Sequence, residues 1–236
     1  MLAADRFAAN LARVRARIHA AAQAAGRNEQ QVTLVGASKG QPAAAVAVAL
    51  AAGLGHFGEN YVQDALPKMA EVAQGLVAGS AVPTWHFIGA LQANKTRAVA
   101  ENFAWVHAVD RLHIAQRLAQ QRPFHAPPLN VCVQVHVGGE ASKGGVEAAA
   151  LPGLLAAIAA LPRLQLRGLM CLPPPEHDPQ RQRYWLRQLR ELFESVNAAG
   201  AGLDTLSMGM SADLEAAVQE GATLVRIGTD LFGPRG

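Results

Sequence analysis

The sequence of 236 residues lacks what a membrane protein or a disulfide-stabilised secreted protein needs. No apolar run approaches the roughly 18 uncharged residues that cross a bilayer, and no short apolar segment near the start precedes a small-residue cleavage site. The two cysteines, Cys132 and Cys171, lie inside apolar runs, where a free thiol behaves as a small hydrophobic side chain. We therefore expect a globular protein of the reducing cytoplasm, without disulfides and without a membrane partner.

Concentrated charge and metal-ligand spacings are also missing. The net charge is +3, and basic residues are scattered among acids except in the first predicted helix, which argues against a nucleic-acid partner. The eight histidines show no HExxH or HxH spacing, and the two cysteines are far apart, so no metal site is expected. What the chain does have is a hydrophobic fraction of 50%, enough to bury a substantial core.

The first helical segment holds the one basic cluster. Its arginines are Arg6, Arg13, Arg15 and Arg17. A mitochondrial transit peptide is amphipathic and poor in acids in this way, but the segment contains no serine. Its apolar residues follow spacings of 4, 3 and 4, at Phe7, Leu11, Val14 and Ile18. That stripe favours a structural N-terminal helix that docks on a core.

The rest of the chain alternates short β-branched or aromatic runs with alanine-rich helical runs, without a long linker. Strands are predicted at 31–38, 56–60, 84–90, 105–110, 129–137, 164–171, 204–209 and 223–228. Helices are predicted near 42–52, 61–74, 94–101, 111–121, 147–161, 179–199 and 211–220. Alternation of this kind indicates a parallel sheet with crossover helices. Eight similar units fit a single-domain (β/α)8 TIM barrel over residues 1–236, with an extra N-terminal helix, better than an open doubly wound sheet.

The barrel predicts where chemistry lies, because active sites of this fold collect at the carboxyl ends of the strands. Lys39 follows the first strand in VTLVGASKG. It is either a solvated surface lysine or the reactive group of a site. Strand 7 runs into Ser211, and strand 8 runs through Arg226 into Gly228 and Thr229. Ser211 is either a helix N-cap or a phosphate ligand.

The two last loops favour a phosphate site beside Lys39. Gly228 lets the backbone approach a ligand closely, and the amide and hydroxyl of Thr229 are donors for phosphate oxygens. Barrel closure pairs strand 8 with strand 1, which brings Arg226 and these loops beside Lys39. Desolvation and a neighbouring guanidinium favour the neutral amine of Lys39, which is then a nucleophile for an aldehyde. Pyridoxal 5'-phosphate fits such a pocket, and so does a sugar phosphate in a Schiff-base aldolase.

Three further residues are weaker candidates. Asn60 and His86, near the ends of strands 2 and 3, are placed to touch a ring edge or its hydroxyl. Histidines on barrel strands are also often satisfied interior residues. Lys143, in the loop after strand 5, is interpreted as a solvated charge on the catalytic face.

Seven segments carry a resemblance to a known family. In order they are ASK (37–39), FGENYVQ (57–63), WHFIGALQANK (85–95), EASKGG (140–145), LRGLMCLPP (166–174), LSMGMSADLEAA (206–217) and VRIGTDLFG (225–233). Through them the whole chain resembles the pyridoxal phosphate homeostasis protein family, also called the proline synthetase co-transcribed homologues. The resemblance implies a barrel similar to the N-terminal domain of alanine racemases, of fold-type III, without their second, β-rich domain.

The resemblance also assigns roles. It implies that Lys39 is the Schiff-base lysine, that Ser211, Gly228 and Thr229 contact the phosphate, and that Arg226 bonds the pyridine nitrogen. The first hypothesis is a non-catalytic, monomeric binding protein that holds pyridoxal phosphate, serves vitamin B6 balance and delivers cofactor to apoenzymes. The alternatives are an amino-acid racemase or decarboxylase that uses the same cofactor, and a Schiff-base aldolase.

Overall fold

The computed structural model describes residues 3–77, 79–138 and 144–233. Eight parallel strands close into a barrel in the order β1 to β8, with β8 paired to β1. The strands are β1 (Thr33–Ala37), β2 (His56–Glu59), β3 (Thr84–Phe87), β4 (Trp105–Val109), β5 (Leu129–Gln134), β6 (Leu164–Met170), β7 (Thr205–Ser207) and β8 (Leu224–Ile227). The predicted fold class is therefore confirmed.

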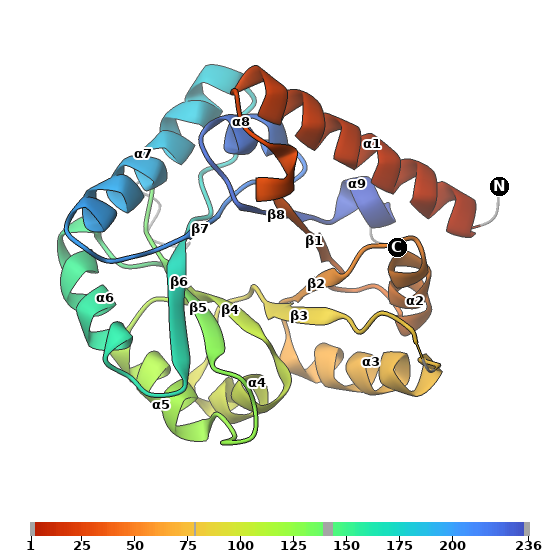
Figure 1. Ribbon diagram of the computed structural model, residues 1–236, viewed down its shortest axis with the longest axis horizontal. Coiled ribbons are helices and arrows are strands. Elements are labelled where there is room, and N and C mark those ends of the chain that lie inside the picture. Colours follow the sequence, from red (N-terminus) through yellow and green to blue (C-terminus); the bar gives the residue numbers. More distant parts are fainter. Residues whose placement is uncertain (1–2, 78, 139–143, 234–236) are drawn as a thin grey trace.

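Helices surround the barrel (Figure 1). They are α1 (Ala3–Ala24), α2 (Ala43–Ala51), α3 (Val62–Gly75), α4 (Thr96–Asn102), α5 (Leu112–Gln121), α6 (Leu151–Ala159), α7 (Pro179–Ala198), α8 (Leu214–Gln219) and α9 (Thr229–Phe232). Single 3-10 turns are η1 (Glu29–Gln31), η2 (Ala93–Lys95) and η4 (Ala148–Ala150). All the predicted helices are present, and the short α9 was not predicted. Among the described residues, no helix combines the length and apolar character needed to cross a membrane.

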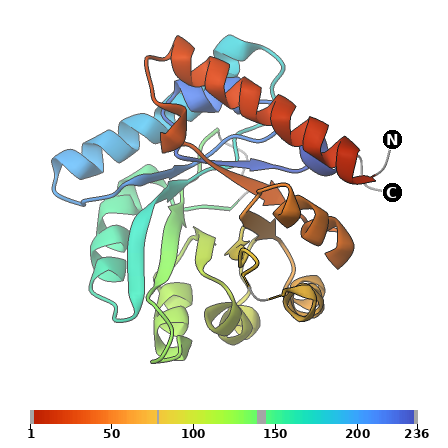
Figure 2. The same ribbon diagram turned by 45° about the vertical axis from the view of Figure 1, so that its right-hand side comes forward.

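The predicted N-terminal helix is α1, and it lies along the outside of the barrel against α8 and α9 (Figures 1 and 2). The four residues of its apolar stripe, Phe7, Leu11, Val14 and Ile18, are all buried. The phenyl ring of Phe7 contacts that of Phe232 in α9, with 5.3 Å between ring centroids. The stripe therefore joins the N-terminal helix to the last turn of the chain, as expected for a structural helix.

Several predicted strands extend beyond the observed ones at their carboxyl ends. Predicted strand 129–137 ends at Gln134, and predicted strand 204–209 ends at Ser207. Beyond these ends single backbone hydrogen bonds continue, from Val135 N–H to Met170 O and from Met208 N–H to Leu224 O, before the chain turns into the loops at the carboxyl edge. Both cysteines are buried free thiols, and burial raises the pKa of each to about 12, so the thiolate form is absent at neutral pH.

Candidate functional site

Lys39 lies at the carboxyl end of the barrel, in the turn that follows β1, and is half-buried. In the β1–β8 ladder Val35 is the partner of Arg226 and Gly36 is the partner of Ile227. A Cβ on Gly228 would lie 3.4 Å from the carbonyl oxygen of Ala37, which places the start of the last loop against the end of β1. The predicted pairing of strands 8 and 1 is confirmed.

A buried ion pair supports the turn that carries Lys39. Lys68 Nζ lies 2.6 Å from Glu59 Oε1, and both side chains are buried. Lys68 also donates to the carbonyl oxygen of Ser38 at 2.8 Å, and the Ser38 hydroxyl donates to Glu59 Oε1 at 2.6 Å. The residue that precedes Lys39 is thus held through both its backbone and its side chain.

Sequence reasoning missed this ion pair, although the sequence contained a signal for it. On α3 the buried residues Val62, Ala65 and Val72 form the apolar stripe, and Lys68 lies on the same face. A lysine inside an apolar helical stripe needs a buried acid or carbonyl nearby. Glu59, inside the short strand β2, is that acid.

Arg226 is almost completely buried, with 4% of its surface exposed. Its Nη1 donates to the hydroxyl of Ser207 at 2.7 Å, and its Nη2 donates to the carbonyl oxygen of Cys171 at 3.0 Å. Burial lowers the pKa of Arg226, while the nearby Asp213 carboxylate raises it. Because a guanidinium holds its proton throughout the physiological range, Arg226 is a fixed positive charge inside the barrel. This buried arginine therefore has hydrogen-bond partners on two other strand ends of the barrel.

The loop after β7 runs beside β8 before α8 begins. Met208 N–H donates to Leu224 O, and Arg226 N–H donates to Gly209 O. Gly209 has a φ of 98°, a backbone conformation that favours glycine.

Residues 211–213 form a turn, so Ser211 is not the N-cap of α8. The N-cap position is taken by Asp213, whose carboxylate accepts from Met210 N–H at 2.6 Å. Burial raises the pKa of Asp213. The helix-cap alternative for Ser211 is wrong, because the first three residues of the predicted helix 211–220 form a turn instead.

Gly228 and Thr229 follow the end of β8, as predicted. Thr229 is the first residue of α9 and is exposed. Gly228 accepts hydrogen bonds from Leu231 N–H and Phe232 N–H at its carbonyl oxygen. The polar groups of this loop therefore lie at the carboxyl edge of the barrel, next to the turn that carries Lys39.

Arg17 of α1 connects the two loops that were predicted to bind phosphate. Its guanidinium donates to the Ser211 carbonyl oxygen at 3.0 Å, to both oxygens of Glu215 at 2.6 and 2.8 Å, and to Asp230 at 2.5 Å. The hydrogen bonds to Glu215 raise the pKa of Arg17, and the same bonds lower the pKa of Glu215. Arg17 thus forms ion pairs with Glu215 of α8 and Asp230 of α9, the helices that follow the two loops. This role of the basic N-terminal cluster was not foreseen.

Asn60 and His86 occupy different environments. Asn60 lines a pocket of about 550 Å³ between the loops after β2 and β3, together with Tyr61 and Lys95. Its Oδ1 is buried and has no hydrogen-bond partner among the described residues. His86 has no exposed surface, and its two ring nitrogens lie 3.0 Å from His56 and 2.9 Å from His107. His86 is thus the satisfied interior histidine that the sequence allowed as an alternative.

The predictions for Lys143 and for a metal site remain to be placed. Lys143 lies outside the described residues. Within residues 3–77, 79–138 and 144–233, no three His, Cys, Asp or Glu side chains gather in a way that could hold a metal ion.

Comparisons with known proteins agree on one family. Residues 9–236 match the family described as alanine racemase, N-terminal domain. A protein of Pseudomonas aeruginosa named pyridoxal phosphate homeostasis protein is 58% identical over 230 residues, covering 97% of this chain and 96% of that protein. The Escherichia coli K12 protein of the same name is 50% identical over 229 residues, covering 97% of each chain.

Solved structures agree with the fold. The structure of PipY from Synechococcus elongatus with PLP bound has a TM-score of 0.83 at 35% identity, covering 96% of this chain and 100% of that one. Alanine racemase from Corynebacterium glutamicum has a TM-score of 0.67 at 15% identity, covering 97% of this chain and 60% of that one. The second similarity concerns the barrel alone.

Proposed function

The chain belongs to the family of pyridoxal phosphate homeostasis proteins, whose barrel is that of the alanine racemase N-terminal domain, and from that premise we propose its role. It binds pyridoxal 5'-phosphate as a Schiff base on Lys39 and serves vitamin B6 balance in the cytoplasm. The observation that carries this proposal is the position of Lys39, in the turn after β1 beside the loop that begins at Gly228. When bound, the cofactor supplies an aldehyde carbon for an amine to attack.

The residues at this face fit the cofactor. We assign the phosphate to Ser211, Gly228 and Thr229, in the two loops that Arg17 ties together. The buried cation of Arg226 is assigned to the pyridine nitrogen. The unpartnered Oδ1 of Asn60 is an acceptor for the ring hydroxyl. His86 makes no direct contact in this assignment, because both of its nitrogens are bonded inside the barrel.

The role of a monomeric carrier that hands cofactor to apoenzymes is favoured over catalysis. Arg226 keeps a neighbouring pyridine nitrogen unprotonated, because a fixed positive charge disfavours a second one beside it. The ring is then a weak electron sink, and turnover needs well-placed acid and base groups. Neither of the two tyrosines in the chain is a buried acid or base group. Tyr184 is half exposed on α7, and Tyr61 is 62% exposed at the start of α3.

Solvent deuterium exchange at the α-carbon of a panel of amino acids, followed by NMR, tests the carrier role. We expect at most one exchanged amino-acid molecule for each protein molecule present. Exchange over many turnovers that Tyr61→Phe abolishes would establish a racemase or decarboxylase instead. The visible absorption of the purified protein separates both from the aldolase, which needs no such chromophore.

Ser211→Ala is expected to weaken binding of pyridoxal phosphate much more than binding of unphosphorylated pyridoxal. A hydrogen bond to a charged phosphate contributes roughly 1.5 to 3 kcal/mol, and only the phosphorylated ligand can lose it. Equilibrium titration of the two ligands measures the difference. Ser195→Ala, on the exposed surface of α7, is the control. Equal weakening of both ligands would remove Ser211 from the phosphate site.

A further inference from the structure

Five side chains form a continuous chain of hydrogen bonds inside the barrel, which we call the histidine chain: His56, His86, His107, Ser207 and Arg226. His56 Nδ1 lies 3.0 Å from His86 Nε2, and His86 Nδ1 lies 2.9 Å from His107 Nε2. His107 Nδ1 lies 2.7 Å from the Ser207 hydroxyl, which also accepts from Arg226 at 2.7 Å. Barrel interiors of this kind are usually filled by branched apolar side chains, so a polar chain here needs an explanation.

The histidine chain runs through the barrel interior from β2, β3 and β4 to β7 and β8. His56 is the first residue of β2, and His86 pairs with Gly58, two residues further along that strand. His107 is two residues beyond Trp105, which pairs with His86. Ser207 is the last residue of β7. The register therefore places His86 two residues beyond the partner of His56, and His107 two residues beyond the partner of His86.

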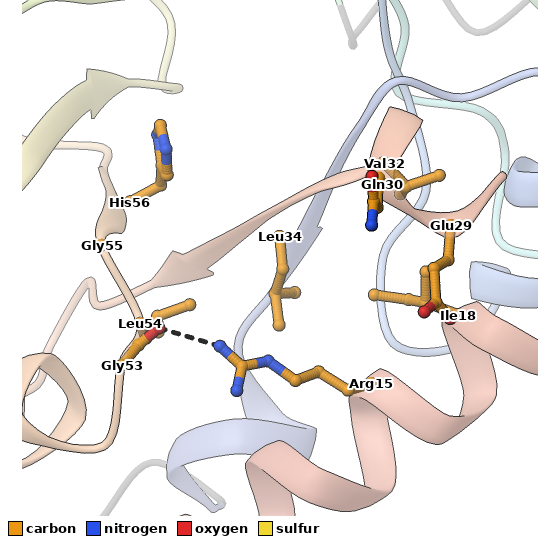
Figure 3. A pocket seen from close by; sticks show the side chains of 10 residues that line it. All are labelled: Arg15, Ile18, Glu29, Gln30, Val32, Leu34, Gly53, Leu54, Gly55 and His56. Carbon is orange, nitrogen blue, oxygen red and sulfur yellow. Dashed lines mark hydrogen bonds between the residues drawn. The ribbon is translucent and has the colours of Figure 1, made fainter.

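The His56 end of the histidine chain reaches an open pocket at the amino ends of the strands. This pocket has a volume of about 330 Å³ and is lined by His56, Arg15 and Leu34 among others (Figure 3). His56 is half-buried, and its Nε2 has no hydrogen-bond partner among the described residues. The opposite end is Arg226, which has almost no exposed surface.

All three imidazoles are neutral at physiological pH. Burial lowers the pKa of His56, and burial together with the neighbouring rings holds the pKa of His86 well below its ordinary value. Burial and the Arg226 cation lower the pKa of His107 to about 3. A neutral imidazole donates from one nitrogen and accepts at the other. Because both nitrogens of His86 and His107 are in use, the bonds must all run in the same direction, either away from Arg226 or toward it.

We propose that the histidine chain runs away from Arg226, with the Ser207 hydroxyl donating to His107 Nδ1 and every ring carrying its proton on Nε2. His56, His86 and His107 are then positioning residues for Arg226. In this direction the buried hydroxyl proton of Ser207 has an acceptor. In the reverse direction the Ser207 hydroxyl accepts from both His107 and Arg226. The hydroxyl proton of Ser207 then has no acceptor among the described residues.

Electrostatics selects the same direction. When each group donates away from Arg226, the negative end of every dipole points toward the buried guanidinium. In the reverse direction the N–H of His107 points its positive end at the same cation. Hydrogen bonds in series polarise one another, and the low dielectric of the interior strengthens the effect. The histidine chain therefore solvates the Arg226 cation where water is absent.

A ring stack fixes the middle of the histidine chain. The imidazole of His86 lies on the indole of Trp105, with 5.5 Å between centroids and 14° between planes. The guanidinium of Arg167 covers the same indole at 5.0 Å. The rings are bonded pairwise through different nitrogens, so they present no common point to a metal ion. Insofar as Arg226 faces the pyridine nitrogen, which rests on the proposed function, the histidine chain sets the orientation of that contact.

The test is NMR of the ligand-free protein with nitrogen-15 in its histidines, at about pH 8, above the ordinary histidine pKa of about 6.5. We expect the proton on Nε2 in all three rings, and nitrogen–nitrogen couplings across the His56–His86 and His86–His107 bonds. Ser207→Asp puts an acceptor without a proton beside Arg226, so the proton should move to Nδ1 in all three rings, including the distant His56. Ser195→Asp, on exposed α7, should change none of them.

The outcomes separate this inference from the proposed function. Protons on Nδ1 in the wild-type protein, or missing couplings, would overturn the proposed direction, and the wild-type measurement suffices if Ser207→Asp does not fold. A folded Ser207→Asp with an unchanged His56 would overturn the coupling. In a separate titration, Ser207→Ala should weaken pyridoxal phosphate binding about tenfold. A protein with the expected tautomers that binds no pyridoxal phosphate would contradict the proposed function alone.

Discussion

Lys39→Ala is expected to abolish the visible absorption and the reductive labelling that pyridoxal phosphate produces on the wild-type protein. Only a primary amine forms the Schiff base, and Lys39 is the lysine that follows β1, next to the loop at Gly228. The phosphate loops are unchanged in this variant, so it should still bind the cofactor without a covalent bond. Absorption spectra before and after borohydride reduction, followed by peptide mapping, measure the loss.

Lys95→Ala is the matched control for this experiment. Lys95 lines the pocket beside Asn60, so it is a second lysine at the carboxyl ends of the strands. Its replacement should leave both the spectrum and the labelled peptide unchanged. A label on Lys95 or Lys143, with Lys39 unmodified in the wild-type protein, would contradict the assignment of the Schiff base.

The strands and their order were predictable because the strands of a parallel sheet, largely buried on both faces, read as short runs rich in apolar residues. Eight such runs separated by helical segments leave few arrangements other than a closed barrel. The ends of the strands were less predictable. The regular strands end at Gln134 and Ser207, only single backbone hydrogen bonds continue beyond them, and the apolar pattern continues past both points.

Within the site, the sequence was informative where a residue type has one strong chemical reason to be at a strand end. Lys39 and the loop at Gly228 were found in that way. The ion pair of Glu59 and Lys68 was missed because its partners are joined by folding: Lys68 lies in the apolar stripe of α3, but the sequence does not specify which acid it meets. The same holds for Arg17, whose carboxylate partners Glu215 and Asp230 come from the far end of the chain.

The histidine chain shows a further limit of sequence reasoning. Three histidines on three successive strands were visible in the sequence, but their mutual contacts depend on strand register and on barrel curvature. His86 alone was considered as a ligand contact. The register that pairs His86 with Gly58 and Trp105 places it between His56 and His107, and no periodicity in the sequence specifies that register.

Lys68→Met is expected to lower the free energy of unfolding by about 3 to 5 kcal/mol, the usual cost of leaving one partner of a buried ion pair uncompensated. Glu59 has 1% of its side chain exposed, and its Oε2 already has no hydrogen-bond partner among the described residues. The variant also removes the donor to the Ser38 carbonyl oxygen. Chemical denaturation monitored by circular dichroism measures the change.

The matched control is Arg97→Met, which breaks the exposed pair of Arg97 and Glu101 within α4 and should cost less than about 1 kcal/mol. A second variant, Glu59→Met with Lys68→Met, removes both buried charges and should recover most of the lost stability, because apolar pairs of similar volume replace buried ion pairs at little cost. Lys68→Met and the double variant both remove the donor to the Ser38 carbonyl oxygen, so labelling of Lys39 should slow in each of them. A loss for Lys68→Met as small as that for Arg97→Met would show that the buried pair does not hold the turn of Lys39.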